Sequence, residues 1–166
     1  VFYPQFLPRV GVSSSLAISL YLAANGAAGG VAAVGYDRLV DRAARSTLVL
    51  VALVCWTVGF ALAAVVETRA GAVVPVVLLG LGVGLVFPST CAWVETCAPA
   101  EKTGQFSSYI ASFGYTGQFL SPLLFGPLVP LVGVRGVFGA AAGVAGVGAL
   151  GLGVWAWRRA SAVADA

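Results

Sequence analysis

The chain contains five apolar stretches of about 20 residues, the length at which a helix crosses the roughly 30 Å hydrocarbon core of a bilayer. Short clusters of charged and turn-forming residues separate these stretches, which run over residues 14–36, 47–66, 72–93, 107–131 and 137–157. Helices are expected because each backbone amide in lipid needs a hydrogen-bond partner within its own segment. The sequence therefore predicts an all-α polytopic transmembrane helix bundle with about five spanning helices.

The charged residues are few and scattered, which excludes several classes of function. Only 9% of the residues are charged, and nine Lys and Arg stand against six Asp and Glu without forming a basic face for phosphates, so no nucleic-acid partner is expected. The chain has no His, and Cys55, Cys91 and Cys97 form no CxxC pair, so they are interpreted as packing residues. We expect no metal site, no cofactor and no enzymatic activity.

The positions of the basic residues predict the topology. Five spans place alternate connections on opposite sides of the membrane, and the side with more Lys and Arg is expected to be cytoplasmic. Trp155 and Trp157 suit an interfacial anchor at the end of the last span. The expected division is 1–13 as the end of a preceding helix and an outer loop, 14–157 as the bundle, and 158–166 as a cytoplasmic tail. The six bases expected in the cytoplasm are Arg38, Arg42, Arg45, Lys102, Arg158 and Arg159, and the three expected outside are Arg9, Arg69 and Arg135.

Three motifs occur in an order that resembles the major facilitator superfamily. The loop GYDRLVDRAARS at 35–46 repeats the Asp-Arg step of the cytoplasmic loop between the second and third helices of each half in that family. GLGVGLVFP at 80–88, followed by APAEKTG at 98–104, resembles its Gly-rich helix and the next cytoplasmic loop. GYTGQFLSPLLFGPL at 114–128 resembles the helix after that. The chain is similar to helices eight to twelve, the C-terminal half, preceded by a remnant of helix seven.

The resemblance implies a function and a partner. It implies secondary transport of a small-molecule substrate by alternating access, and proton-coupled efflux is one form that such transport can take. It also implies an N-terminal transporter half that completes the protein. The chain is expected to begin within a longer protein and to reside, in contact with membrane lipid, as a multi-pass protein of the plasma membrane. Its richness in Arg, Ala, Gly and Val favours a prokaryotic inner membrane. The alternative is a small non-transporting membrane bundle that acts as an assembly or regulatory subunit.

Isolated polar residues within two spans are the candidates for the substrate cavity. Tyr21 and Asn25 are four residues apart on the first span, and Tyr115 and Gln118 are three apart on the fourth, so each pair lies along one helical stripe. The resemblance identifies these spans as helices eight and eleven, which line the cavity in the family. Hydrogen bonding between helices is the alternative role for these side chains.

Charged residues near the expected cytoplasmic face are the candidates for gating and coupling. Asp37, Arg38, Asp41, Arg42 and Arg45 can form a gate whose carboxylates and guanidiniums pair with neighbouring helix ends in one state, or they can be a solvated loop that only fixes topology.

Glu95 is the one acid expected within a span. It is a candidate for proton coupling; the alternatives are that it extends to the interface or pairs with a loop arginine.

Pairs of glycines four residues apart predict where helices approach closely. Small residues at this spacing let two backbones meet in lipid. The pairs are Gly26 and Gly30, Gly80 and Gly84, and Gly139 and Gly143.

Overall fold

The computed structural model describes residues 2–164, and helices make up most of them, with no strand in this range. Two short N-terminal turns precede five long helices, which confirms the predicted all-α bundle. The elements in chain order are α1 (Tyr3–Phe6), η1 (Leu7–Val10), α2 (Ser15–Val34), α3 (Tyr36–Val40), α4 (Arg45–Val65), α5 (Val73–Cys97), η2 (Ala100–Lys102), α6 (Thr103–Phe125), η3 (Gly126–Leu128) and α7 (Val129–Ala164).

The apolar segments are long enough for five crossings. The helical segments 15–34, 45–65 and 73–97 each suit one span, and a fourth segment of 59 residues, 100–158, is also apolar enough to cross a membrane. As one helix that segment would be about 90 Å long, three times the hydrocarbon thickness. It is broken at η3 and at Gly133, whose φ of 71° and ψ of 171° are outside the helical region. It therefore holds two spanning helices, α6 and α7.

Several helix boundaries differ from the sequence-based prediction, among them the ends of the last two helices. The fourth span was expected to reach residue 131, but α6 ends at Phe125, where Gly126 and Pro127 start a 3₁₀ turn. Pro127 lacks the N–H that a continuing α-helix would use, which favours the break at this point. The last helix was expected to end near 157, whereas α7 continues to Ala164, so the part of the tail that the structure describes extends the helix.

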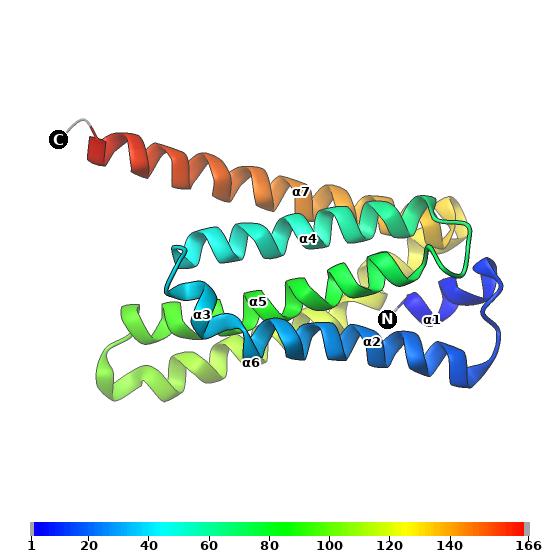
Figure 1. The fold of residues 1–166 in the computed structure, drawn as a ribbon, viewed down its shortest axis with the longest axis horizontal. Helices are drawn as coiled ribbons and strands as arrows, with labels where there is room; N and C mark the ends of the chain where they lie inside the picture. Colours follow the sequence, from blue (N-terminus) through cyan, green and yellow to red (C-terminus); the bar gives the residue numbers. More distant parts are fainter. Residues whose placement is uncertain (1, 165–166) are drawn as a thin grey trace.

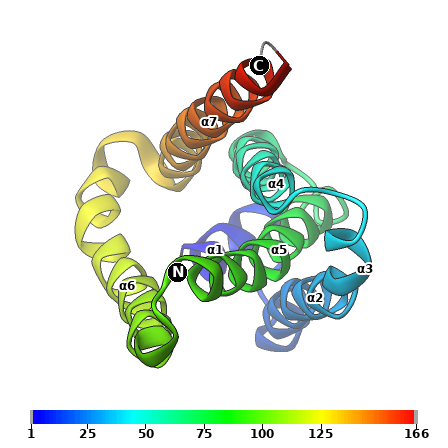
Figure 2. The ribbon, with the colours of Figure 1, turned by 90° about the vertical axis from the view of Figure 1, so that its left-hand side faces the viewer.

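The long helices form a row with one helix set apart. α2 packs along α5, α5 along α4, and α4 along α7. Figure 2 shows α6 on the other side of the bundle, facing this row. None of the α6 residues is buried, although the helix is rich in apolar side chains.

Successive connections lie at opposite ends of the bundle (Figure 1). We call the end that holds α1, the 66–72 loop and η3 the outer end, and the end that holds α3, η2 and the last turns of α7 the inner end. The inner end carries the larger group of basic residues, and the outer end carries Arg9, Arg69 and Arg135.

The N-terminal turns pack into the outer end of the bundle. The rings of Tyr3 and Phe6 make T-shaped contacts with the ring of Phe138, with centroids 5.8 and 5.5 Å away, and Phe60 stacks on Phe138 at 6.3 Å. The Tyr3 hydroxyl donates a hydrogen bond to the Ala72 carbonyl oxygen at 2.9 Å. Burial raises the pKa of the Tyr3 phenol, so it acts here as a neutral donor. This aromatic cluster joins α1, α4 and α7.

Glycines set the spacing between α2 and α5. A Cβ added to Gly80 would overlap the backbone oxygen of Asn25, and one added to Gly84 would overlap the backbone oxygen of Gly29. The predicted close approach at Gly80 and Gly84 is therefore confirmed. The predictions for two other pairs are wrong, because a Cβ at any of their members would meet open space; these are Gly26 and Gly30, and Gly139 and Gly143.

Candidate functional site

A groove of about 920 Å³ lies between α6 and the row of helices, in the middle of the bundle. Residues of α1, α2, α4, α5, α6 and α7 line it, and most of its wall is apolar. Ligand sites of this size are usually apolar with a few polar groups that orient the ligand.

Polar side chains reach the groove from both of its walls. Tyr21 and Asn25 contribute from α2, and Gln118 and Ser121 contribute from α6 on the other side. Gln118 makes no hydrogen bond within the described part of the chain, so its amide has two donor hydrogens and an acceptor oxygen available to a ligand. The structure thus brings together three of the four side chains predicted for the cavity.

Tyr21 and Asn25 also hold α2 against neighbouring parts of the chain. The Tyr21 hydroxyl donates to the Arg69 carbonyl oxygen at 2.7 Å, and Asn25 Nδ2 donates to the Val76 carbonyl oxygen at 2.9 Å. Interhelical hydrogen bonding, the alternative role, is therefore present for Asn25, whereas Tyr21 bonds to the loop between α4 and α5. The Asn25 side-chain oxygen and the second N–H of its amide remain for a ligand, since the bond to Val76 uses one donor.

Tyr115 does not join this group. Its side chain is 71% exposed and does not line the groove. A role for Tyr115 in the cavity remains a prediction.

Sequence reasoning missed two polar residues of the groove, Ser121 and Trp56. Ser121 is three residues after Gln118, so helical spacing could have identified it. The Trp56 indole donates from Nε1 to the Leu79 carbonyl oxygen at 3.2 Å and lies where a Cβ on Gly82 would be. No sequence pattern marks this contact, because it depends on how α4 packs against α5.

The predicted gate residues lie at the inner end, and four of them face solvent. Asp37 and Arg38 are exposed on α3, and Asp41 and Arg42 are exposed just after it. Within residues 2–164 none of these four makes an ion pair or a side-chain hydrogen bond. Arg45 differs, since it is half-buried and lines a second pocket. The gating role of the loop remains a prediction.

Glu95 is in the last turn of α5, which ends at Cys97. Its side chain is exposed and has no ion-pair partner among the described residues. Its role in proton coupling remains a prediction.

Five spanning helices around a mainly apolar groove define a polytopic membrane protein of the helix-bundle type. A comparison with protein families matches residues 1–165 to the Major Facilitator Superfamily. The chain therefore belongs to this superfamily, whose members are membrane transporters. Comparisons with curated proteins and with solved structures found no match.

Proposed function

We propose that this chain is part of a secondary active transporter that moves a small solute across the membrane by alternating access. The observation that carries the proposal is the central groove, with Asn25 on one wall and, on the other, the amide of Gln118, which makes no hydrogen bond among the described residues. Transporter sites are expected near the bilayer midplane, between helices that belong to different repeats. A second transporter half would close the groove and supply the rest of the substrate contacts.

The loose packing of α6 supports the proposal that this helix moves during transport. α6 buries none of its residues and contains Pro122, while α5 contains Pro88. A proline inside a helix removes one backbone hydrogen bond and allows a bend. We propose that α6 and its partner half shift against the row of helices between the two states, with Asp37, Asp41 and their neighbouring arginines closing the inner end in one of them.

Export is the direction we propose, with protons as the coupling ion and Glu95 as the candidate acid. Membership in the superfamily supports transport, and Glu95 is the one acid of α5, in its last turn. The plasma membrane of a prokaryote is the proposed location.

The experiment is a transport assay on the complete protein that contains this chain, reconstituted in proteoliposomes and screened against a panel of labelled small solutes. For a transported solute, Gln118→Ala should raise KM roughly two- to tenfold, the loss expected for one hydrogen bond. Gln105→Ala is the matched control, because Gln105 is also on α6 but does not line the groove, and its side chain bonds only to the Tyr109 hydroxyl at 2.8 Å. Equal effects of the two variants would contradict a substrate site at Gln118.

The exposed surface of α6 also fits the second candidate function, a non-transporting bundle that assembles with a partner protein. Apolar α6 side chains such as Phe113 and Phe119, 78% and 74% exposed, can be covered by a partner in either case. The transport assay distinguishes the two functions. A regulatory bundle would bind its partner protein but would give no gradient-driven flux of any solute in the panel.

A further inference from the structure

A second cavity, of about 540 Å³, lies at the inner end of the bundle and is separate from the central groove. The start of α4, the inner part of α5 and the inner part of α7 surround it. Its volume is within the range of sites for small ligands. We call it the inner pocket; the lining residues that the argument uses are Val40, Arg45, Ser46, Trp93 and Trp155.

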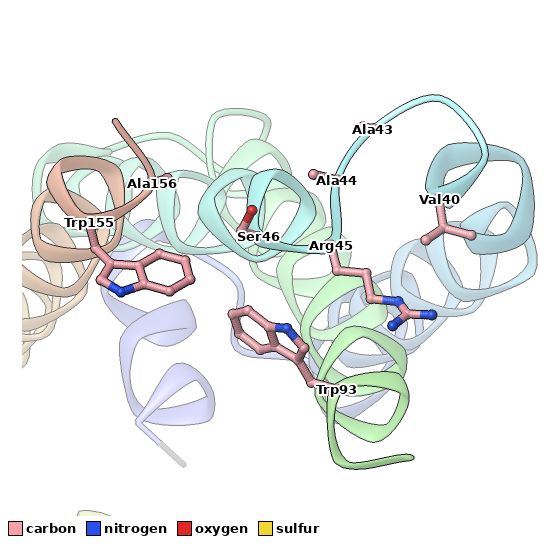
Figure 3. Close-up of a pocket in the computed structure, with 8 residues that line it drawn as sticks. All are labelled: Val40, Ala43, Ala44, Arg45, Ser46, Trp93, Trp155 and Ala156. Carbon is pink, nitrogen blue, oxygen red and sulfur yellow. The ribbon is translucent and has the colours of Figure 1, made fainter. Parts of the chain in front are cut away.

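The inner pocket has an aromatic part and a cationic part. In Figure 3 the indole rings of Trp93 and Trp155 extend toward each other from α5 and α7, with Ser46 of α4 above them. The Arg45 side chain extends away from the indoles, toward the side where Val40 lies. A ligand that contacts both parts must be apolar at one end and able to bind a guanidinium at the other.

The charge of Arg45 indicates that the ligand is an anion. Its side chain is half-buried, and within the described residues it makes no ion pair and no side-chain hydrogen bond. Arg135, in contrast, is bound to Glu67 Oε1 at 3.3 Å and to the Val66 carbonyl oxygen at 3.1 Å. The described lining of the inner pocket contains no carboxylate that could serve Arg45 in the same way. A partly buried cation is stabilised when an anion binds it, because the binding offsets the loss of water.

The position of the inner pocket favours a lipid over a soluble anion. The pocket is at the end of the bundle where the basic residues gather and where the apolar parts of α4, α5 and α7 end. Tryptophans concentrate at the level of lipid headgroups, and basic pockets between spanning helices on the cytoplasmic side bind acidic headgroups. An anionic phospholipid carries a phosphate and an apolar chain in the arrangement that the pocket presents.

We propose that the inner pocket binds the headgroup of an anionic phospholipid. Arg45 binds the phosphate, the Ser46 hydroxyl donates a hydrogen bond to the headgroup, and the glycerol and the first chain methylenes pack against Trp93 and Trp155. This proposal does not depend on the transported solute, since it concerns residues outside the central groove.

The test is native mass spectrometry of the full chain in detergent, with phosphatidylglycerol and phosphatidylcholine of the same acyl chains added in equal amounts. We expect one phosphatidylglycerol to be retained about tenfold in preference to phosphatidylcholine, as a charge-assisted contact predicts. Arg45→Gln should abolish this preference. Arg42 is three residues before Arg45, is exposed and does not line the pocket. Arg42→Gln removes the same charge and should preserve the preference for phosphatidylglycerol.

Two controls make each outcome decisive. Arg45→Lys keeps the positive charge but loses the bidentate guanidinium. Its preference for phosphatidylglycerol should therefore be weaker than that of the wild type and stronger than that of Arg45→Gln. It replaces the Gln variant if that variant fails to fold. Glycerol 3-phosphate in excess should not displace the bound lipid. The proposal is overturned by equal losses in the Arg42 and Arg45 variants, by a wild type without preference, or by displacement with glycerol 3-phosphate, which would identify a soluble phosphate as the ligand.

Discussion

At the scale of single residues, Asn25 combines a structural bond with a place in the central groove. Asn25→Leu removes the hydrogen bond to Val76 and replaces the amide with an apolar side chain of similar size between α2 and α5. The expected loss in the free energy of unfolding is about 0.6 kcal/mol and at most about 1.7 kcal/mol, the range for hydrogen bonds between spanning helices. Thermal unfolding in detergent would measure it. A loss in transport with unchanged stability would instead assign Asn25 to the solute alone.

Two tyrosine hydroxyls, both near helix ends, offer a matched comparison. Tyr36 is buried, and its hydroxyl has no hydrogen-bond partner in the part of the chain that the structure describes, whereas the hydroxyl of Tyr3 donates to Ala72. An unsatisfied buried polar group costs about 1–3 kcal/mol, so Tyr36→Phe should leave the melting temperature unchanged or raise it. Tyr3→Phe should lower it. Equal decreases would show that the Tyr36 hydroxyl has a partner in the folded protein.

Glu95 is the residue on which proton coupling would depend. In the reconstituted complete protein, Glu95→Gln should abolish solute movement driven by a proton gradient while leaving solute exchange intact, because the neutral amide cannot release a proton. Glu101→Gln is the control, since Glu101 is an exposed acid in η2 at the same end of the bundle. Full gradient-driven activity of Glu95→Gln would exclude it from coupling.

At the scale of elements, the contact between α2 and α5 depends on glycine. Gly80→Ala would place a methyl group against the backbone of α2 at Asn25, which cannot move aside as a side chain can. Forced overpacking of this kind costs about 1–3 kcal/mol, and we expect Gly80→Ala to lower the melting temperature accordingly. Gly30→Ala is the control on α2, since its methyl group meets open space and alanine favours helix. A neutral Gly80→Ala would mean that the two helices are further apart in solution.

The sequence was sufficient for the existence of the elements but not for their packing faces. The apolar stretches predicted all five long helices because the membrane length is a strong constraint. The pair at Gly80 and Gly84 was predicted correctly, yet its partner on α2 is Gly29 and not Gly26 or Gly30. A helix that is apolar on every side carries no stripe that tells which glycines face a neighbour. Contacts between helices are therefore the part of the fold that spacing alone leaves open.

The same distinction holds for the candidate site at the scale of the whole molecule. Asn25 and Gln118 were identified from sequence because an amide is rare in a membrane span, and the structure places both along the groove. Trp56 was not identified from sequence, and Trp93 and Trp155 were not assigned to a common pocket, since their positions depend on neighbours on other helices. Polar residues in an apolar helix can be identified from sequence, whereas pockets formed by apolar or aromatic side chains can be identified only from the packed helices.

The arrangement of the two ends makes a prediction about orientation in the membrane. Cys97 is exposed at the inner end, while Cys55 and Cys91 are half-buried within α4 and α5. If the more basic inner end is cytoplasmic, a maleimide that cannot cross membranes should label Cys97 in inside-out vesicles but not in intact cells.

The converse variant places the label at the other end. Cys97→Ser combined with Ala70→Cys moves the reactive thiol to an exposed position in the 66–72 loop, and this variant should be labelled in intact cells. Reversed labelling of both proteins would show the opposite orientation, with the acidic and basic residues of α3 outside the cell. That result would contradict both the cytoplasmic gate and the inner pocket as a cytoplasmic lipid site. Labelling of both positions from the same side would contradict the alternating crossings themselves, because the single helix α5 joins the two positions across the bundle.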